Sequence, residues 1–301
     1  MSPSALERLA VYFAPLRTRQ GILARAALGT SDPGDVALGR HLIAGLTADI
    51  RADGSVAGGA MPTIWRGHEL LDLGLSPRDP AMTHLVEWLL ARQGRPGAYG
   101  DGCDKVRHGQ KVCEHFVQGF FAPAPPQQRI TPITVPNGKA FRSEPAARFA
   151  ISCLGLRLAL RAGLGDRPGV VQHLDTLRAL AERWTEWDGF FSPDVIVAGL
   201  HALALGGAEY RTTVEALVGT VSAHQRVDGF WANADTFATL DALLASDLPE
   251  AQRVMRRVAP ELAERQRADG AFGATAQQER ALIALRALLA AAKAPPPGRR
   301  G

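Results

Sequence analysis

The sequence predicts an all-α protein with the fold of an (α/α)6 toroid, a barrel in which six outer helices surround six inner helices. Two observations support this fold class. A glycine turn recurs along the chain at nearly constant spacing, and the helices on the two sides of a turn differ in polarity. Together they describe a repeated pair of helices, one with a polar face and one that is apolar almost all round.

The recurring turn is clearest in AHQRVDGFWANAD at 223–235 and ERQRADGAFGATAQQ at 264–278. Its glycine anchor is found at Gly54, Gly97, Gly138, Gly189, Gly229 and Gly270, with spacings of 43, 41, 51, 40 and 41 residues. Glycine suits this position because a tight reversal between helices often needs a residue with positive φ. We expect Gln225 and Gln266, which end the preceding helices, to bond backbone groups left free at the helix termini.

The two kinds of helix are distinguished by their hydrophobic pattern. The helix predicted at 168–184 (PGVVQHLDTLRALAERW) carries apolar residues along one stripe and charged residues off it, so it has one solvated face. The segments VIVAGLHALALGG at 195–207 and ARFAISCLGLRLAL at 147–160 are apolar nearly all round. Such helices must be buried on most sides, which places them in an inner ring.

Length, charge and cysteine content narrow the class of protein. We expect one α/α toroid domain over residues 1–294 and a disordered tail at 295–301. The net charge is only +4 and the basic residues are scattered, which argues against a nucleic-acid partner. Three cysteines are too few for a disulfide framework. Because no signal peptide and no membrane span are apparent, we expect a cytoplasmic location.

The turns also carry a resemblance to a known superfamily. QRVDGFW and QRADGAF resemble the Gln-x-x-Asp-Gly-x-Trp/Phe repeat shared by triterpene cyclases and the β-subunits of protein prenyltransferases, with weaker repeats over residues 35–292. The resemblance implies a toroid with a central cavity for a small hydrophobic or isoprenoid-like ligand. The Asp-x-Asp-Asp acid of protonating cyclases and the Asp-Asp-x-x-Asp motif of metal-ionising cyclases are both absent from the sequence.

The resemblance to prenyltransferase β-subunits implies a zinc site. Those proteins bind zinc through an Asp-x-Cys pair after a glycine turn and a later histidine, and Asp101-Gly-Cys103 follows Gly97 here. The stretch DGCDKVRHGQKVCEHF concentrates ligand types that zinc prefers, from which we predict Cys103, Cys113 and His115 as ligands, with Asp101 or His108 in the fourth position. A pair of buried thiols with two solvated imidazoles is the alternative interpretation.

A proline-rich stretch follows this cluster. APAPPQQRITPITVP at 122–136 contains five prolines, which are incompatible with a regular helix. We therefore predict that 101–137 interrupts the repeat as an irregular segment. Long irregular segments inside compact domains are often functional, although loss of one degenerate repeat would produce the same pattern.

Residues directly after the turns would converge at one end of the central cavity, because the inner helices begin there. The candidates for substrate binding are Trp65, Arg66, His68, Arg142 and Arg148, whose arginines suit an anionic group. The catalytic candidates are Asp101, His108, Asp194 and Asp235, with Glu144 and Glu279 at comparable positions. Asp194 and Asp235 also precede apolar runs, as helix caps do.

These observations favour a zinc-dependent enzyme, a transferase or lyase acting on an isoprenoid-like or hydrophobic substrate in the central cavity. Two other hypotheses remain open. One is a non-catalytic toroid that binds a ligand or a protein and contains a structural zinc. The other is a protonating terpene cyclase with an atypical acid, in which a carboxyl group kept protonated by its surroundings attacks an alkene.

Overall fold

A computed structural model describes residues 4–92, 129–182, 184, 186–187 and 192–293. In this part of the chain, six helices form an outer ring: α1 (Ala5–Phe13), α3 (Asp35–Ala48), α5 (Pro80–Leu90), α9 (Pro168–Ala181), α11 (Arg211–Ala223) and α13 (Pro249–Glu264). Six others form an inner ring: α2 (Arg19–Leu28), α4 (Ala60–Asp72), α8 (Glu144–Arg161), α10 (Pro193–Ala204), α12 (Thr236–Ser246) and α14 (Gln277–Lys293).

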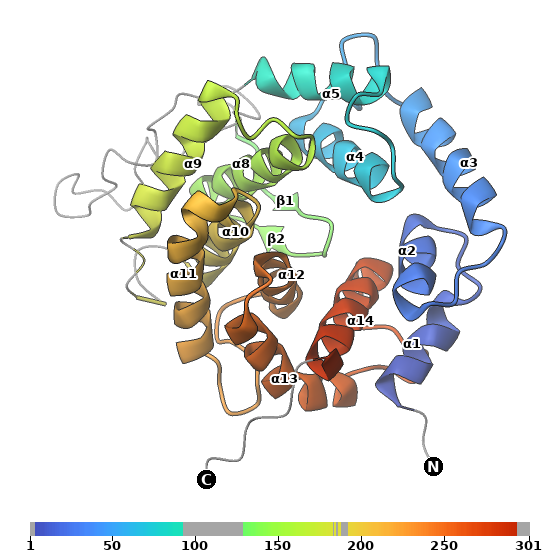
Figure 1. The fold of residues 1–301 in the computed structure, drawn as a ribbon, viewed down its shortest axis with the longest axis vertical. Helices are drawn as coiled ribbons and strands as arrows, with labels where there is room; N and C mark the ends of the chain where they lie inside the picture. The colour runs from blue at the N-terminus through green and yellow to red at the C-terminus, as the bar shows by residue number, and fades with distance from the viewer. Residues whose placement is uncertain (1–3, 93–128, 183, 185, 188–191, 294–301) are drawn as a thin grey trace.

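The inner ring is closed. Each inner helix packs against the next in the order α2, α4, α8, α10, α12 and α14, and α14 returns to α2 (Figure 1). The outer helices cover this ring, and α1 and α13 both lie against α14. The predicted all-α toroid is therefore confirmed.

The polarity of the helices follows their position. On α13 the buried residues are Ala251, Val254, Met255, Val258 and Leu262, a single stripe at helical spacing. On α8 nearly every residue from Ala147 to Ala159 is buried, because the helix has outer helices on one side and the ring interior on the other. None of the described helices is long and apolar enough to cross a membrane.

The helix pairs differ from the expected assignment in one respect. The pair formed by α1 and α2 comes from residues before 35, where the sequence showed no repeat, and it fills the place between α14 and α4. The segment predicted to be irregular, 101–137, is described only from residue 129. Gly97 and Gly189, like the tail at 295–301, lie outside the described residues.

The prediction that Gly138 reverses the chain between two helices is wrong. Gly138 lies instead in the turn of a short hairpin formed by β1 (Ile133–Thr134) and β2 (Ala140–Phe141), which points into the centre of the ring (Figure 1). Prolines explain the difference, because Pro132 and Pro136 cannot donate the backbone hydrogen bonds of a helix. Pro136 suits the second position of the turn, where its fixed φ is required.

The turns at Gly54, Gly138, Gly229 and Gly270 share one geometry. In the fifth unit the Gly229 N–H donates to the Arg226 carbonyl at 2.9 Å, and the Arg226 N–H donates to the Phe230 carbonyl at 2.8 Å. The Asp228 carboxylate accepts the Phe230 N–H at 3.1 Å. This is a three-residue hairpin loop that ends in a left-handed residue, and it explains the Asp-Gly or Asn-Gly pair in each of these four turns.

Glycine is also required because the turn touches the next outer helix. A Cβ on Gly229 would lie 2.8 Å from the Arg257 carbonyl oxygen of α13, and a Cβ on Gly270 would lie 2.8 Å from the Arg8 carbonyl oxygen of α1. The contact at Gly270 joins the last turn of the chain to its first helix.

The two glutamines before these turns hold the same junctions. Gln225 donates through Nε2 to the Gly229 carbonyl at 2.7 Å and to the Val254 carbonyl of α13 at 3.0 Å. Gln266 donates to the Gly270 carbonyl at 3.1 Å and to the Ala5 carbonyl of α1 at 3.3 Å. The glutamines do bond backbone groups, but their partners are carbonyls of the turn and of the neighbouring outer helix, not the expected free groups at the end of the preceding helix.

We predict that Gly270→Ala will lower the free energy of unfolding by about 3 to 4 kcal/mol, because it adds a clash with α1 to the cost of a left-handed alanine. Gly74→Ala is the matched control. Gly74 has the same φ of 87° but no atom within 4 Å of the added Cβ, so its loss should be about 1 kcal/mol. Urea unfolding of both variants measures the difference, and equal losses would show that the contact with α1 is unimportant.

Candidate active site

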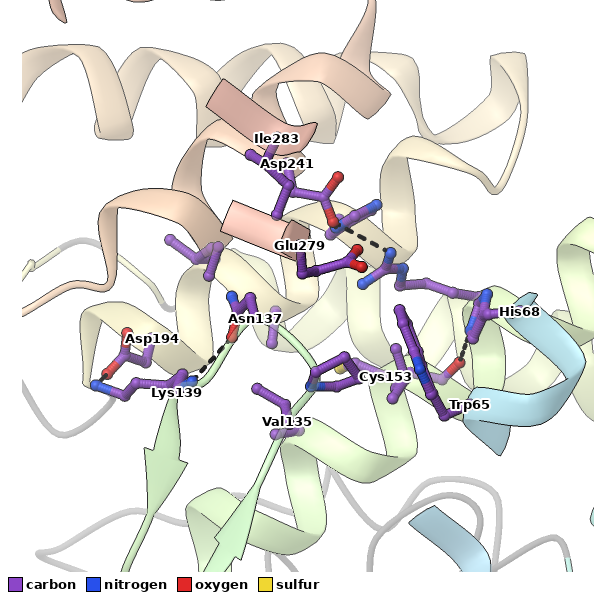
Figure 2. Close-up of a pocket in the computed structure, with 18 of the residues that line it drawn as sticks. Trp65, His68, Val135, Asn137, Lys139, Cys153, Asp194, Asp241, Glu279 and Ile283 are labelled. Carbon is purple, nitrogen blue, oxygen red and sulfur yellow. Dashed lines mark hydrogen bonds and ion pairs between the residues drawn. The ribbon is translucent and has the colours of Figure 1, made fainter. Parts of the chain in front are cut away.

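A chamber of about 140 Å³ lies inside the inner ring, next to the β1–β2 hairpin (Figure 2). This volume is close to the ~150 Å³ of an engineered cavity that binds benzene. The walls come from α4, α8, α10, α12 and α14, and the hairpin contributes Val135, Pro136, Asn137, Lys139 and Phe141.

Four of the inner helices each contribute a pair of lining residues that are seven positions apart in the sequence. Residues at this spacing lie about 10 Å apart along a helix. The pairs are Trp65 and Asp72, Ala150 and Arg157, Asp194 and His201, and Glu279 and Arg286. The later residue of each pair is charged or a histidine. Leu154, Val197 and Ile283 lie between the members of these pairs along their helices, so apolar residues separate two levels that both carry charged side chains.

The base of the hairpin is fixed by Glu144, at the first turn of α8. Its carboxylate accepts the N–H groups of Ile130 and Thr131 at 3.0 and 3.1 Å and the Thr131 hydroxyl at 3.0 Å. Arg148, which is fully buried, donates to the same carboxylate at 2.9 Å. Burial would raise the pKa of Glu144, but the hydrogen bonds from Ile130, Thr131 and Arg148 outweigh it and hold the pKa below its usual value.

The tip of the hairpin is fixed to the opposite side of the ring. Arg280 of α14 donates through Nε to the Asn137 carbonyl at 2.7 Å. Lys139 forms an ion pair with Asp194 of α10 (Figure 2), and Asp194 accepts the Asp235 N–H at 2.9 Å. The hairpin therefore bridges three inner helices, since its base is held by α8.

His68 is buried in the chamber wall as a neutral ring. Burial and the positive charges of Arg157 and Arg161 hold the pKa of His68 well below its usual value. Its Nε2 lies 3.1 Å from the Leu154 carbonyl oxygen and its Nδ1 lies 2.9 Å from an Arg161 nitrogen. These partners assign the proton to Nε2, because a carbonyl only accepts and a guanidinium only donates.

Most carboxylates of the chamber are held by close cations. Asp72 is paired with Arg19 and, at 2.6 Å, with Arg161. Glu279 is paired with Arg19 and accepts a hydrogen bond from Gln20 at 3.1 Å. Each of these carboxylates is therefore in direct contact with at least one guanidinium group.

Asp241 of α12 is held more loosely. Its carboxylate lies 3.5 Å from an Arg157 nitrogen and 3.6 Å from Nδ1 of His201 (Figure 2). Burial, and then the charges of Arg157 and Arg161, hold the pKa of His201 well below its usual value, so this ring is neutral. Asp241 is thus a carboxylate that faces both a cation and a neutral imidazole across the chamber.

A second, more open hollow of about 710 Å³ adjoins the chamber. It is lined by residues of α1, α2, α4, β1 and the start of α14, among them Tyr12, Gln20 and Met61. Trp65, Pro136 and Glu279 line both spaces, so these three side chains form the boundary between the chamber and an outer vestibule.

The structure separates the predicted site residues into two groups. Trp65, His68 and Asp194, together with Glu279, line the chamber. Arg66 braces α4 against α3 through the Leu46 carbonyl and Asp49, Arg142 is exposed, and Arg148 is occupied by Glu144. Asp235 caps α12 by accepting the Ala238 N–H at 2.9 Å, which confirms its interpretation as a helix cap.

The predicted metal ligands cannot be placed. Asp101, Cys103, His108, Cys113 and His115 all lie outside the described residues. Within the described residues, no group of three or more His, Cys, Asp or Glu side chains is arranged to hold a metal ion. Cys153, which lines the chamber, is buried, and burial raises the pKa of its thiol.

No protein-family model and no curated protein matches the chain. Solved structures do. A variant of the type II terpene cyclase MstE from Scytonema, in complex with geranylgeranyl dihydroxybenzoate, has a TM-score of 0.54 and 15% identity over 95% of this chain and 87% of that chain. The MstE structure without ligand gives a TM-score of 0.52 and 16% identity over 96% and 88%.

A protein from Actinoplanes has a TM-score of 0.51 and 16% identity over 97% of this chain and 91% of that chain. The chain has the α/α toroid fold of terpene cyclases. At these identities the likeness concerns the fold of the toroid, and its chemistry depends on the residues of the chamber.

We predict that Glu144→Gln will loosen the hairpin of this toroid without unfolding the ring. The substitution removes the charge and one of two acceptor oxygens, and hydrogen bonds to charged groups contribute about 1.5–3 kcal/mol each. Amide hydrogen exchange over residues 129–141 should become roughly tenfold faster or more. Glu215→Gln on the surface of α11 is the control, and unchanged exchange in the Glu144 variant would mean that the hairpin is held by its tip alone.

Proposed function

We propose that this toroid protonates a carbon–carbon double bond of an isoprenoid-like substrate held in the central chamber, with Asp241 as the acid. The observation that carries the proposal is the loose pairing of Asp241 beside a neutral histidine, in a chamber that Val197 and Ile283 also line. The fold supports it as well, because the neighbour MstE is a type II terpene cyclase that binds a geranylgeranyl compound.

The proposed step begins with Asp241 in its protonated form. The carboxyl proton moves to the less substituted alkene carbon, the π electron pair forms the new C–H bond, and a tertiary cation remains on the neighbouring carbon. A second double bond of the substrate can then supply the electron pair for ring closure. A water molecule then takes a proton from a carbon next to the cationic centre, and the electron pair of that C–H bond forms the final alkene.

The other lining carboxylates are poor acids for this step. Asp72 contacts two guanidinium groups, Glu279 contacts Arg19, and Asp194 contacts Lys139. Each would need to lose an ion pair before it could take up a proton. Among the described residues, Asp241 has no cation or ring nitrogen within 3.5 Å except the Arg157 nitrogen at that distance.

The wall beside Asp241 suits a short apolar chain. Val197 and Ile283 lie near it on the neighbouring helices, and Trp65 and Phe141 add aromatic faces, which attract cations. A volume of about 140 Å³, close to that of a cavity that binds benzene, holds about one prenyl unit. A longer chain would extend past Trp65 and Pro136 into the vestibule.

We predict that Asp241→Asn will abolish cyclisation, with a loss of about 10²- to 10⁴-fold, since asparagine cannot donate a carboxyl proton. The measurement is product analysis by mass spectrometry and NMR after incubation with dihydroxybenzoates that carry geranyl, farnesyl or geranylgeranyl chains. Glu215→Gln should keep full activity. An active Asp241→Asn variant would exclude this acid, and an inactive wild type across the series would exclude the reaction.

A zinc-dependent reaction is a second candidate, based on the Cys103, Cys113 and His115 cluster. The chain leaves the described structure at Arg92, after α5, and returns at Arg129, one residue before the hairpin base. If zinc binds in between, the cluster ligands would hold it and its chemistry would be that of a Lewis acid. No step is assigned to it.

We predict about one zinc per chain in protein purified without added metal, and a steep fall in Cys113→Ser. Elemental analysis measures the metal, and thermal unfolding after chelation distinguishes a structural ion from a catalytic one. Metal-free wild type with freely alkylated Cys103 and Cys113 would remove zinc from consideration. Zinc-dependent turnover that persists in Asp241→Asn would favour this candidate over the first.

A further inference from the structure

Arg157 has hydrogen-bonding capacity that the protein does not use. Its Nε is buried and has no hydrogen-bond partner in the described structure, and its only ion pair is the 3.5 Å contact with Asp241. A guanidinium carries five N–H donors in a fixed plane. An unused donor at the chamber wall costs free energy unless a ligand accepts it.

Arg286 supplies a second cation to the same chamber. It lies on α14, seven residues after Glu279, and within the described residues it forms no ion pair. Arginine stays charged in proteins, because its pKa lies far above neutral pH. The chamber therefore contains one guanidinium with a free donor and another without a carboxylate partner.

The charges around the chamber disfavour a ligand with more than one negative charge. Four carboxylates, Asp72, Asp194, Asp241 and Glu279, face four lining cations, Lys139, Arg157, Arg161 and Arg286. Arg19 pairs with both Asp72 and Glu279 from behind, and the charge of Glu69 acts on it in turn. Because His68 and His201 are neutral, the lining carries no net charge, so a bound carboxylate adds one uncompensated negative charge and a diphosphate adds more.

We infer that Arg157 and Arg286 form a subsite for the carboxylate head of an isoprenoid substrate, and that occupation of this subsite transfers a proton to Asp241. The second half of the inference rests on the proposed function, in which Asp241 is the acid. The first half concerns binding alone.

The coupling follows from competition for Arg157. A substrate carboxylate that accepts from Arg157 replaces Asp241 as the partner of this guanidinium and places a second negative charge close by. Two carboxylates that share a site cannot both remain ionised without a large cost, so one takes up a proton from solvent. Asp241 is the better candidate, since it then faces the neutral His201.

The surroundings of Asp241 are consistent with this assignment. Arg157 of α8 and His201 of α10 face it, and Arg161 of α8 and Arg286 and Glu279 of α14 line the same chamber. The outer helices α11 and α13 contribute no titratable group to the described chamber lining. The contact with Arg157 is therefore the one that an anionic ligand would displace.

The test uses citronellate, a short isoprenoid carboxylate, and its uncharged methyl ester. Titration calorimetry of the full-length wild type should show at least roughly tenfold tighter binding of the carboxylate. Titrations in two buffers with different ionisation enthalpies should show net proton uptake, approaching one per ligand, with citronellate only. Asp241→Asn should bind citronellate at least as tightly and take up no proton.

Two arginine variants test the subsite itself. Arg157→Gln and Arg286→Gln should each remove most of the preference for the carboxylate over the ester, while Arg211→Gln on the exposed side of α11 should retain it. Equal binding of acid and ester by wild type would overturn the inference, as would carboxylate binding without proton uptake. Both readouts on wild type remain valid even where an arginine variant fails to fold.

The outcomes also separate this inference from the proposed reaction. Selective binding with proton uptake, but no cyclised product from any prenylated benzoate, would support the subsite and reject the reaction. Cyclisation of acid and ester at equal rates would support the reaction and reject the subsite. Geranyl diphosphate that binds more tightly than citronellate would identify a phosphate head and overturn the carboxylate assignment.

Discussion

The contact between the last turn and the first helix is the constraint on which the toroid depends. Gly270 lies against the backbone of α1, Gln266 bonds the Ala5 carbonyl, and Arg8 donates to the Gln266 amide oxygen at 2.8 Å. The Gln225 turn makes the equivalent contacts with α13 inside the chain. Ring closure therefore uses the junction that already joins neighbouring units. Without it, the apolar faces of α1 and α14 that meet at the seam would be exposed to water.

Closure of the ring of inner helices leaves a space at its centre, and the β1–β2 hairpin lies in this space. Its loop has the same hydrogen-bond pattern as the outer turns, with Asn137 in place of aspartate. What differs is the surface it contacts: Gly138 packs on Thr275 and Ala276 of the sixth unit instead of on an outer helix. The predicted substrate residue Arg148 thus has a different role, because with Glu144 it fixes the segment that narrows the chamber.

Features that depend on residues close together in the chain were predictable from the sequence. Features that depend on residues of distant helices meeting in space were not. The glycine turns and the polarity of each helix depend on residues close in the chain, so the toroid was predicted correctly. The α1–α2 pair lacks the turn motif and is recognised only because it completes the ring. Asp241 and Arg157 were missed because each is an ordinary polar residue on its own helix. The sequence signal that could have identified these chamber residues is the seven-residue spacing from Ala150 to Arg157 and from Glu279 to Arg286.

The ion pairs of the chamber add little to the stability of the fold, because the attraction within a buried ion pair seldom exceeds the free-energy cost of removing both charges from water. Asp72 and Glu279 are each held by guanidinium groups that other residues also fix. Rigid pairs of this kind give the wall a fixed electrostatic field. A fixed field lets a single weak contact, that between Asp241 and Arg157, respond to a ligand while its surroundings do not. The 3.5 Å contact between Asp241 and Arg157 therefore differs from the ion pairs around it, which are closer.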